Sequence, residues 1–341
     1  MELGITSFAE TYPNPMTGEE ISHAERLRQV VEEVVLAEEV GLDVYGLGEH
    51  HRPDFASSSP ATVLGAAAGR TSRIRLFPAV SILSTDDPVR VYQQFSTLDA
   101  VSSGRAELLV GRGSFIESFP LFGYSLDDYD ELFAEKLDLL LQIRDEEAVD
   151  WSGKFRSPIQ GQGIYPRTEG RPLPIRVAVG GTPASIIRAA ERGLEVALAI
   201  IGGSPDRFKV LADLHRRTLR ENGYDPDEVP LSVHAHGYVA DSDEQAADEY
   251  YNSYAVAMST IGRERGWGPM SRQQFDTMRQ PEGSLVLGDP ETVATKILRW
   301  KEILGVTRFE LHISVGTLPH PQVRRSIELL GTKVAPLVRE P

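Results

Sequence analysis

Short runs of apolar, often β-branched residues alternate along the whole chain with longer stretches in which apolar residues recur at helical spacing. Leu3–Phe8 is a run of the first kind, and the next stretch places Leu27, Val30 and Val34 on one helical face before Gly41 ends it. The pattern predicts strands at residues 3–8, 44–49, 75–82, 106–110, 175–179, 196–201, 231–239 and 309–315, and helices at residues 24–40, 61–69, 88–101, 129–145, 183–192, 206–222, 244–261, 290–304 and 322–337.

A strand followed by a helix, repeated eight times, is typical of parallel β-sheet architectures. An open doubly wound sheet is the alternative, but eight such units favour closure into a TIM-type (β/α)8 barrel, which the whole chain, residues 1–341, would form as one domain. Two irregular segments interrupt the rhythm. We expect residues 151–173, after the fourth strand, to form an excursion or hairpin, and residues 262–287, before the eighth strand, to be an insertion that covers the site as a lid.

Composition narrows the classes of partner and of chemistry. The net charge of −15 disfavours nucleic acid and anionic membranes, so we expect a small-molecule substrate. The absence of cysteine excludes disulfides, thiolate metal sites and a cysteine nucleophile. No apolar run is long enough to span a bilayer, and the first residues do not resemble a secretory signal, so we expect a cytoplasmic protein.

In a parallel barrel, the active site lies where the strands end and the following loops begin. The segments to inspect are therefore residues 49–51, 79–81, 111–114, 180–182 and 201–203. Three of these five segments are rich in glycine, which lets the backbone approach a bulky ligand closely.

Two adjacent turns have the composition of a phosphate site. One predicted strand is followed by Gly180, Gly181 and Thr182, with proline at the first position of the next helix, and the next strand is followed by Gly202 and Gly203. Free backbone N–H groups at the start of a helix attract a phosphate. Each turn alone could be an ordinary helix cap, but barrel phosphate sites are usually shared between neighbouring loops.

Ionisable residues gather at the end of the second predicted strand. Glu49, His50 and His51 are consecutive, and neighbouring residues on a strand point to opposite sides, so the two histidines do not share a face. His50 is either a packed histidine or an active-site acid or base. His234 and His236 do share a face, but two histidines leave a metal site short of ligands.

Arg112 lies between two glycines at the end of the fourth predicted strand. A lone arginine usually extends into solvent, whereas in this place it could bind an anion or stack on an electron-rich ring. Phe8, Phe55, Phe115 and Trp267 are candidates for the lining of an apolar pocket.

Six motifs together resemble the bacterial-luciferase-like flavin oxidoreductases over nearly the whole chain. They are Gly48-Glu49-His50-His51; residues 75–83 with Asp87-Pro88-Val89-Arg90; residues 99–105; Val110-Gly111-Arg112-Gly113; Val179-Gly180-Gly181-Thr182; and residues 288–294. The resemblance implies reduced FMN at the carboxyl ends of the strands. It also implies that a separate flavin reductase supplies the cofactor and that the protein is a homodimer.

The resemblance also assigns roles to particular residues. The backbone of Ala79, Val80 and Ser81 would pack against the flavin ring, with a non-proline cis peptide between the first two. Arg112 and Gly113 would lie by the ring or the phosphate. The backbone of residues 180–182, next to the Gly202-Gly203 turn, would hold the phosphate.

For catalysis, the resemblance implies that His50 lies near the flavin carbon to which oxygen adds and that Glu49 orients the site or supports the barrel interior. Gly111 stands where luciferase has a cysteine, and there is no sign of a second, dissimilar subunit, so light emission is not expected.

The sequence therefore predicts an FMN-dependent monooxygenase that uses reduced flavin and O2 to oxidise a small organic molecule. Three alternatives stay open: a deazaflavin-dependent hydride-transfer enzyme, a flavin-binding protein without turnover, and a metal-dependent barrel hydrolase built on His234 and His236.

Overall fold

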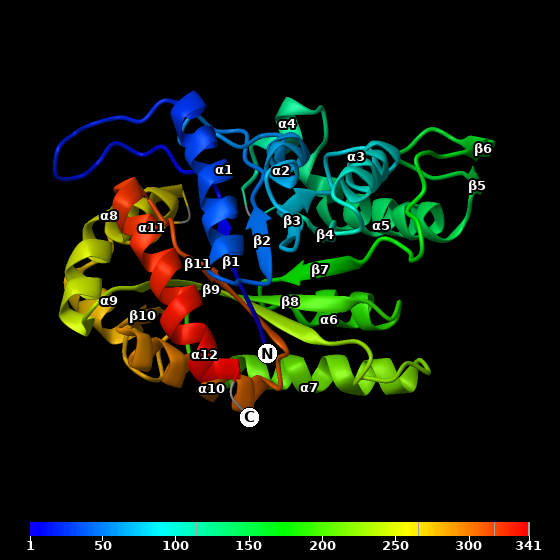
Figure 1. Ribbon diagram of the computed structural model, residues 1–341. Coiled ribbons are helices and arrows are strands. Elements are labelled where there is room, and N and C mark those ends of the chain that lie inside the picture. Colours follow the sequence, from blue (N-terminus) through cyan, green and yellow to red (C-terminus); the bar gives the residue numbers. More distant parts are fainter. Residues whose placement is uncertain (114, 265, 317, 340–341) are drawn as a thin grey trace.

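The computed structural model describes residues 1–113, 115–264, 266–316 and 318–339, and its eight long parallel strands close into a barrel (Figure 1). In barrel order the strands are β1 (Glu2–Ser7), β2 (Val44–Leu47), β3 (Arg75–Ile82), β4 (Leu108–Gly111), β7 (Ile175–Val179), β8 (Glu195–Ile200), β9 (Leu231–Val239) and β11 (Arg308–His312). The barrel closes where β11 pairs in parallel with β1. The predicted (β/α)8 barrel is confirmed.

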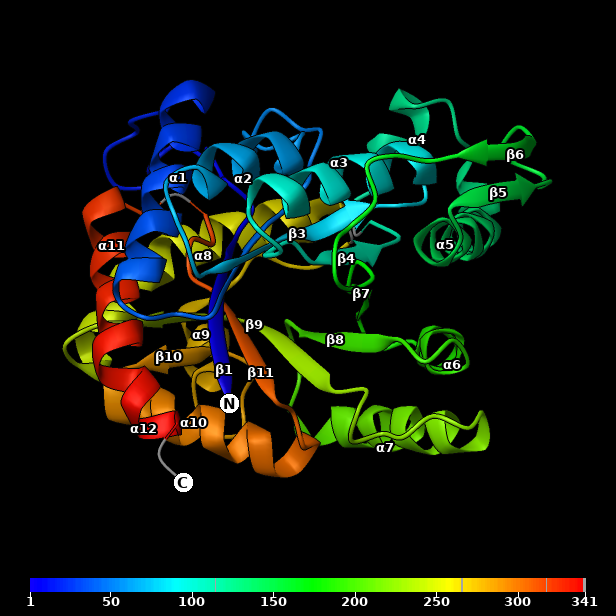
Figure 2. The same ribbon diagram turned by 45° about the vertical axis from the view of Figure 1, so that its right-hand side comes forward.

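Helices surround the barrel on its outer side (Figure 2). They are α1 (His23–Glu39), α2 (Pro60–Ala68), α3 (Pro88–Val101), α5 (Tyr129–Asp145), α6 (Pro183–Ala190), α7 (Asp206–Glu221), α8 (Asp243–Glu264), α10 (Pro290–Leu304), α11 (His320–Leu329) and α12 (Ala335–Arg339), with the short α4 (Ser118–Leu121) above β4. The bounds of α3, α5 and α10 match the prediction. Asp87 is the N-cap of α3, and Asp289 is the N-cap of α10. None of the described helices has both the length and the apolar character needed to cross a membrane.

The two irregular segments differ in how well the sequence anticipated them. The first is the expected hairpin, in which β5 (Ala148–Trp151) pairs with β6 (Ile159–Gly163) and projects away from the barrel (Figure 1). The second was predicted as irregular, yet it contains α9 (Arg272–Met278) and β10 (Val286–Gly288). The three residues of β10 pair with β9, and so short a strand has no detectable periodicity.

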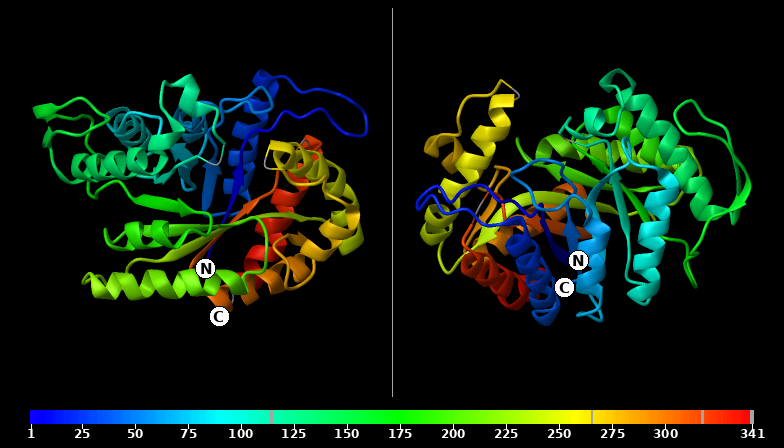
Figure 3. Two further views of the ribbon diagram at one scale, coloured as in Figure 1. Left: turned by 180° about the vertical axis from the view of Figure 1, so that it is seen from behind. Right: turned by 90° about the horizontal axis from the view of Figure 1, so that it is seen from above.

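Several element ends were also misplaced. The strand predicted at residues 309–315 ends at His312, and the helix predicted at residues 322–337 begins at His320 and is interrupted by a π-helical turn at Leu330–Val334. The strand predicted at 44–49 ends at Leu47, which leaves Glu49 and His50 in the loop that follows. The start of β1 and the end of α12 lie at the amino-terminal end of the barrel, opposite these loops (Figure 3).

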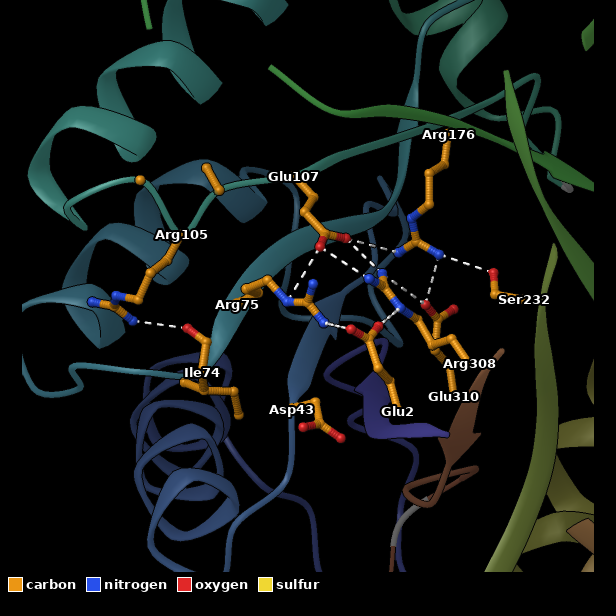
Figure 4. Close-up of polar contacts among 12 residues, drawn as sticks. Glu2, Asp43, Ile74, Arg75, Arg105, Glu107, Arg176, Ser232, Arg308 and Glu310 are labelled. Carbon is orange, nitrogen blue, oxygen red and sulfur yellow. Dashed lines mark hydrogen bonds and ion pairs between the residues drawn. The ribbon is translucent and has the colours of Figure 1, made fainter. Parts of the chain in front are cut away.

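Charged side chains close the amino-terminal end of the barrel, as Figure 4 shows. The Arg308 guanidinium lies 2.6 Å from the carboxylate of Glu107 and 2.7 Å from that of Glu2. Arg176 lies 2.7 Å from Glu310, and both are almost completely buried. No local pattern in the sequence indicates this network, whose members lie on β1, β7 and β11 and, for Glu107, just before β4.

Candidate active site

Small and apolar residues fill the barrel beneath the carboxyl ends of β2 to β8. A separate cluster of buried side chains comprises Val44, Phe77, Ala79, Leu109 and Ala197. The inward positions above it include Gly46 and Gly111, which carry no side chain. This half of the barrel interior is therefore apolar, and we call these residues the apolar floor.

The floor contains the non-proline cis peptide Ala79–Val80 that the resemblance implied. The ladder between β3 and β4 shifts register between Ala79 and Ser81, so Val80 bulges toward the neighbouring strand. A Cβ atom at Gly111 would lie 2.9 Å from a methyl carbon of Val80. Glycine at position 111 is thus explained by the side chain across the ladder.

His50 lies beside this floor inside a cage of aromatic rings. Its imidazole stacks on Phe55 at 4.3 Å and meets Phe8 and Phe115 edge-on at 4.9 and 5.0 Å. The ring is 7% exposed, and its Nδ1 atom lies 3.8 Å from a carboxylate oxygen of Glu117. Three of the four aromatic residues named from the sequence therefore meet here, whereas Trp267 is largely exposed.

Glu117, which the sequence analysis did not single out, provides the negative charge in this cage. Burial acts to raise the pKa of Glu117, but the attraction of the His50 imidazole and backbone hydrogen bonds lower it below the ordinary value. The carboxylate stays charged near neutrality, so it can orient His50 and stabilise a proton on it.

Glu49 ties the end of β2 to the end of β3. One carboxylate oxygen accepts a hydrogen bond of 3.1 Å from the backbone N–H of Ile82, and the other lies 3.0 Å from Nε2 of His51. Both roles that the resemblance implied for Glu49, orienting the site or supporting the barrel interior, stay predictions.

Arg112 shares one carboxylate with a second arginine. Its guanidinium lies 2.6 Å from Asp130 and packs over the ring of Tyr129, whose hydroxyl donates to the carbonyl of Gly113. Arg188, on α6, lies 3.9 Å from the same Asp130. Two guanidinium groups beside one carboxylate leave one positive charge uncompensated, which favours an anion here. Ser114, in the same motif, lies outside the described residues.

The two glycine turns lie at the ends of the adjacent strands β7 and β8. Residues 180–182 and 202–203 are exposed, and a Cβ atom at Gly180 or Gly202 would meet no atom within 4 Å. Gly181 and Gly203 have φ values of +122° and +85°, which other residues rarely adopt. These turns therefore leave backbone open to a ligand.

Buried polar atoms next to these turns fit a phosphate. Within the described ranges, the Oγ of Ser185 and an Nη of Arg188 are buried without a hydrogen-bond partner. Both lie on α6, which begins directly after Thr182. The glycine motif runs on to Ser185, but nothing in the local sequence assigns a role to the side chain of Ser185 or Arg188.

A model of one protein family, described as luciferase-like monooxygenase, matches residues 1–308. The chain belongs to the luciferase-like monooxygenase family. Similar proteins include the alkanal monooxygenase alpha chain of Photobacterium leiognathi, 25% identical over 99% of this chain and 100% of that protein. An uncharacterized protein, y4vJ, of Sinorhizobium fredii is 25% identical over 94% of this chain and 93% of its own length.

Solved structures of similar proteins extend the comparison to the fold. Monooxygenase RslO1 from Streptomyces bottropensis has a TM-score of 0.84 at 24% identity and covers 98% of this chain and 99% of its own. The oxygenating constituent of 3,6-diketocamphane monooxygenase from Pseudomonas putida, in complex with FMN, has a TM-score of 0.78 at 19% identity, covering 98% of both chains. An F420-dependent secondary alcohol dehydrogenase in complex with an F420–acetone adduct has the same TM-score and identity, covering 99% of both.

Luciferase-like monooxygenases and their relatives thus bind either FMN or the deazaflavin F420. Membership of this family makes the protein an oxidoreductase. The apolar floor, the two open glycine turns, and the Ser185 hydroxyl and one Arg188 nitrogen, which have no hydrogen-bond partner among the described residues, fit a flat ring with a phosphate-bearing tail.

Three histidines, His234 and His236 of β9 and His312 of β11, lie close together in the interior of this luciferase-like barrel. The rings of His234 and His236 lie 6.5 Å apart in the barrel interior, as their shared face predicted. His312 of β11 lies close to both. Among the described residues, no group of three His, Cys, Asp or Glu side chains is placed to hold a metal ion.

Proposed function

We propose that the protein is an FMN-dependent monooxygenase that uses reduced FMN and O2 to oxidise a small organic substrate. The observation that supports this most is the aromatic cage of His50 beside the apolar floor. Oxygen chemistry on a reduced flavin needs a site from which water is excluded, so that the reactive form meets substrate first.

Residues of this chain would hold the cofactor at both ends. The Ala79–Val80 peptide and Ser81 would support the flavin ring. Gly180, Gly181 and Thr182, with Gly202, Gly203 and Gly113 nearby, would offer backbone around the phosphate. Arg112 and Arg188 would supply the positive charge, since Asp130 neutralises only one of them.

When it is bound, the cofactor supplies the electrons for oxygen activation. The protein would position the cofactor and the substrate, shield them from water and supply a proton. His50 would hold or give a proton at the edge of the ring, with the charged Glu117 carboxylate 3.8 Å away to orient it. Glu49 would keep the ends of β2 and β3 in register. In the overall reaction one oxygen atom of O2 enters the substrate and the other leaves as water.

Several further expectations belong to the same proposal. A separate reductase would supply the reduced flavin, the protein would form a homodimer in the cytoplasm, and residues 1–341 would make up one domain. The insertion at residues 262–287 would act as the lid.

The test is an anaerobic titration of the protein with reduced FMN and, in parallel, with reduced F420, followed by admission of air. We expect reduced FMN to bind and to be reoxidised by air. Arg188→Met should weaken binding about tenfold or more, since one charge-assisted contact is worth roughly 1.5–3 kcal/mol. Arg217→Met, an exposed arginine near the carboxyl end of α7 and away from both glycine turns, is the matched control.

The outcomes separate the alternatives. Binding of reduced F420 without binding of FMN would replace this proposal by a deazaflavin-dependent hydride transfer. FMN binding without substrate-dependent oxygen uptake, across a panel of aldehydes, ketones and thioethers, would indicate a flavin carrier.

A further inference from the structure

A continuous chain of hydrogen bonds leads from the barrel mouth into the barrel interior through four side chains. A carboxylate oxygen of Glu10, just after β1, lies 2.9 Å from Nε2 of His312 on β11. Nδ1 of the same imidazole lies 3.0 Å from Oγ1 of Thr6 on β1. That hydroxyl lies 2.9 Å from Nε2 of His234 on β9. The strands β9, β11 and β1 are neighbours in the barrel, so their register fixes the spacing of the chain.

The two ends of this hydrogen-bonded chain differ in how deeply their side chains are buried. Glu10, Thr6 and His312 are at most 3% exposed, whereas His234 is only partly buried. The ring of Phe8 lies 4.1 Å from His312 and 6.0 Å from His234 and covers the chain from the side of the His50 cage. His234 lies deeper in the barrel than His312, at the level of Glu310 in the strand register, and it is the one member of the hydrogen-bonded chain with more than a few per cent of its surface exposed to a ligand that enters the barrel.

The proton that this hydrogen-bonded chain can release resides on the carboxyl group of Glu10 rather than on an imidazole. Burial raises the pKa of Glu10 to about 7, although Arg26 and His50 act to lower it. Burial lowers the pKa of both His312 and His234 to about 3, so both rings are neutral at physiological pH. The other titratable groups that interact with Glu10 are the phenols of Tyr12 and Tyr250.

We propose that Glu10, His312, Thr6 and His234 form a proton relay that delivers one proton from Glu10 to a ligand that reaches into the barrel. With Glu10 protonated, each group donates to the next: Glu10 to Nε2 of His312, Nδ1–H of that ring to Thr6, and the Thr6 hydroxyl to Nε2 of His234. The proton of His234 then resides on Nδ1, which is free to donate to the ligand.

Transfer reverses every bond of the chain without a net charge on either ring. Each member accepts a proton on one atom and releases one from another, and His234 passes its Nδ1 proton to an oxygen or nitrogen atom of the ligand that has become negatively charged. Glu10 ends as a carboxylate, Nε2 of both histidines ends protonated, and no electrons move. The use of this proton in turnover rests on the proposed function, but the relay itself is a property of the free protein.

The relay makes a direct prediction for NMR of the ligand-free protein labelled with 15N-histidine. As the pH rises through about 7, His312 and His234 should both change from the Nδ1–H to the Nε2–H tautomer, with one shared midpoint and no imidazolium form. Thr6→Val keeps the shape of the side chain but removes the hydroxyl, so His234 should lose the transition while His312 keeps it. Thr6→Ser is the matched control and should behave like the wild type.

Either of two results would overturn the relay: a His234 tautomer that does not change with pH in the wild type, or one that still changes in Thr6→Val. If Thr6→Val does not fold, Glu10→Gln answers the same question, because an amide has no proton to lose and both transitions should vanish.

Kinetics then separate the relay from the proposed function. With cofactor bound, Thr6→Val should slow the proton-dependent step about a hundredfold with unchanged cofactor affinity, and the rate should no longer fall as the pH rises through 7, whereas Thr6→Ser keeps this dependence. Tautomer coupling without FMN binding would refute the monooxygenase and leave the relay standing. FMN turnover without tautomer coupling would do the opposite.

Discussion

Glycine at position 111 shows how one residue can be dictated by a neighbouring strand rather than by its own. Its φ angle is not unusual, and nothing in the local sequence requires glycine. The bulge at Val80 decides the matter, because it directs two methyl groups at the place where a Cβ would lie, 2.9 and 3.3 Å away. A side chain on β3 therefore sets the residue on β4, and the floor of the site stays flat.

Gly111→Ala should consequently destabilise the protein by about 1–3 kcal/mol, the usual cost of overpacking a buried site. Urea unfolding measures the loss. Val80→Ala removes the opposing methyl groups, so the double variant should be more stable than the sum of the single losses predicts. Strict additivity would mean that the contact between positions 80 and 111 is not the cause.

At the scale of elements, a buried lysine positions the insertion before the last strand. Lys296 of α10 is 4% exposed and donates hydrogen bonds to the backbone carbonyls of Gln280, Arg279 and Leu285. The same turn reaches the end of β8, where the hydroxyl of Ser284 donates to the carbonyl of Ile201, next to the second glycine turn. One side chain thus links α9, β10 and the candidate phosphate site.

Lys296→Met should loosen this turn, since it leaves carbonyl groups without a donor, and each unsatisfied buried group costs about 1–3 kcal/mol. Hydrogen–deuterium exchange should become at least about tenfold faster in residues 279–285 and stay unchanged in β1 to β4. Lys301→Met, on an exposed position of the same helix, serves as the control. Equal exchange in both variants would assign the anchoring of the turn to other contacts.

At the scale of the whole molecule, the barrel has a charged end and a reactive end. Glu107 lies among Arg308, Arg176 and Arg75 at the amino-terminal end. Burial acts to raise the pKa of Glu107, but these arginines lower it to about 2. The carboxylate joins strands that are far apart in sequence, so the network supports barrel closure as a whole.

Glu107→Gln should cost about 3–5 kcal/mol at neutral pH, because Arg308, Arg176 and Arg75 then share only the carboxylates of Glu2 and Glu310, which leaves one buried positive charge without compensation within this network. The folded pKa lies below the ordinary 4.5, so this carboxylate contributes stability above pH 4.5 and loses it as the pH falls toward 2. Urea midpoints across this range should show that dependence in the wild type and less of it in the variant. Glu2→Gln, at the half-exposed rim, should cost less than about 1 kcal/mol. Similar losses in both variants would contradict a special role for the buried carboxylate.

The barrel was predictable because its signals are local. Apolar periodicity within α1, α3, α5 and α10, together with proline and aspartate at the helix starts, identified most elements. The strand β10 was not predictable, since three residues become a strand only when β9 lies beside them. The exact ends of β2 and β11 depend on the same kind of neighbour.

The residues of the site also divide into those that a local motif indicates and those that only the tertiary structure brings together. The sequence by itself determined which strand ends carry glycines, His50, Glu49 and Arg112, because these motifs are continuous. Only the tertiary structure decided that Glu117 faces His50 and that Arg188 shares Asp130 with Arg112. It also joined Thr6 to His312 across 306 residues, since barrel closure places the first and last strands side by side and no local pattern records that contact.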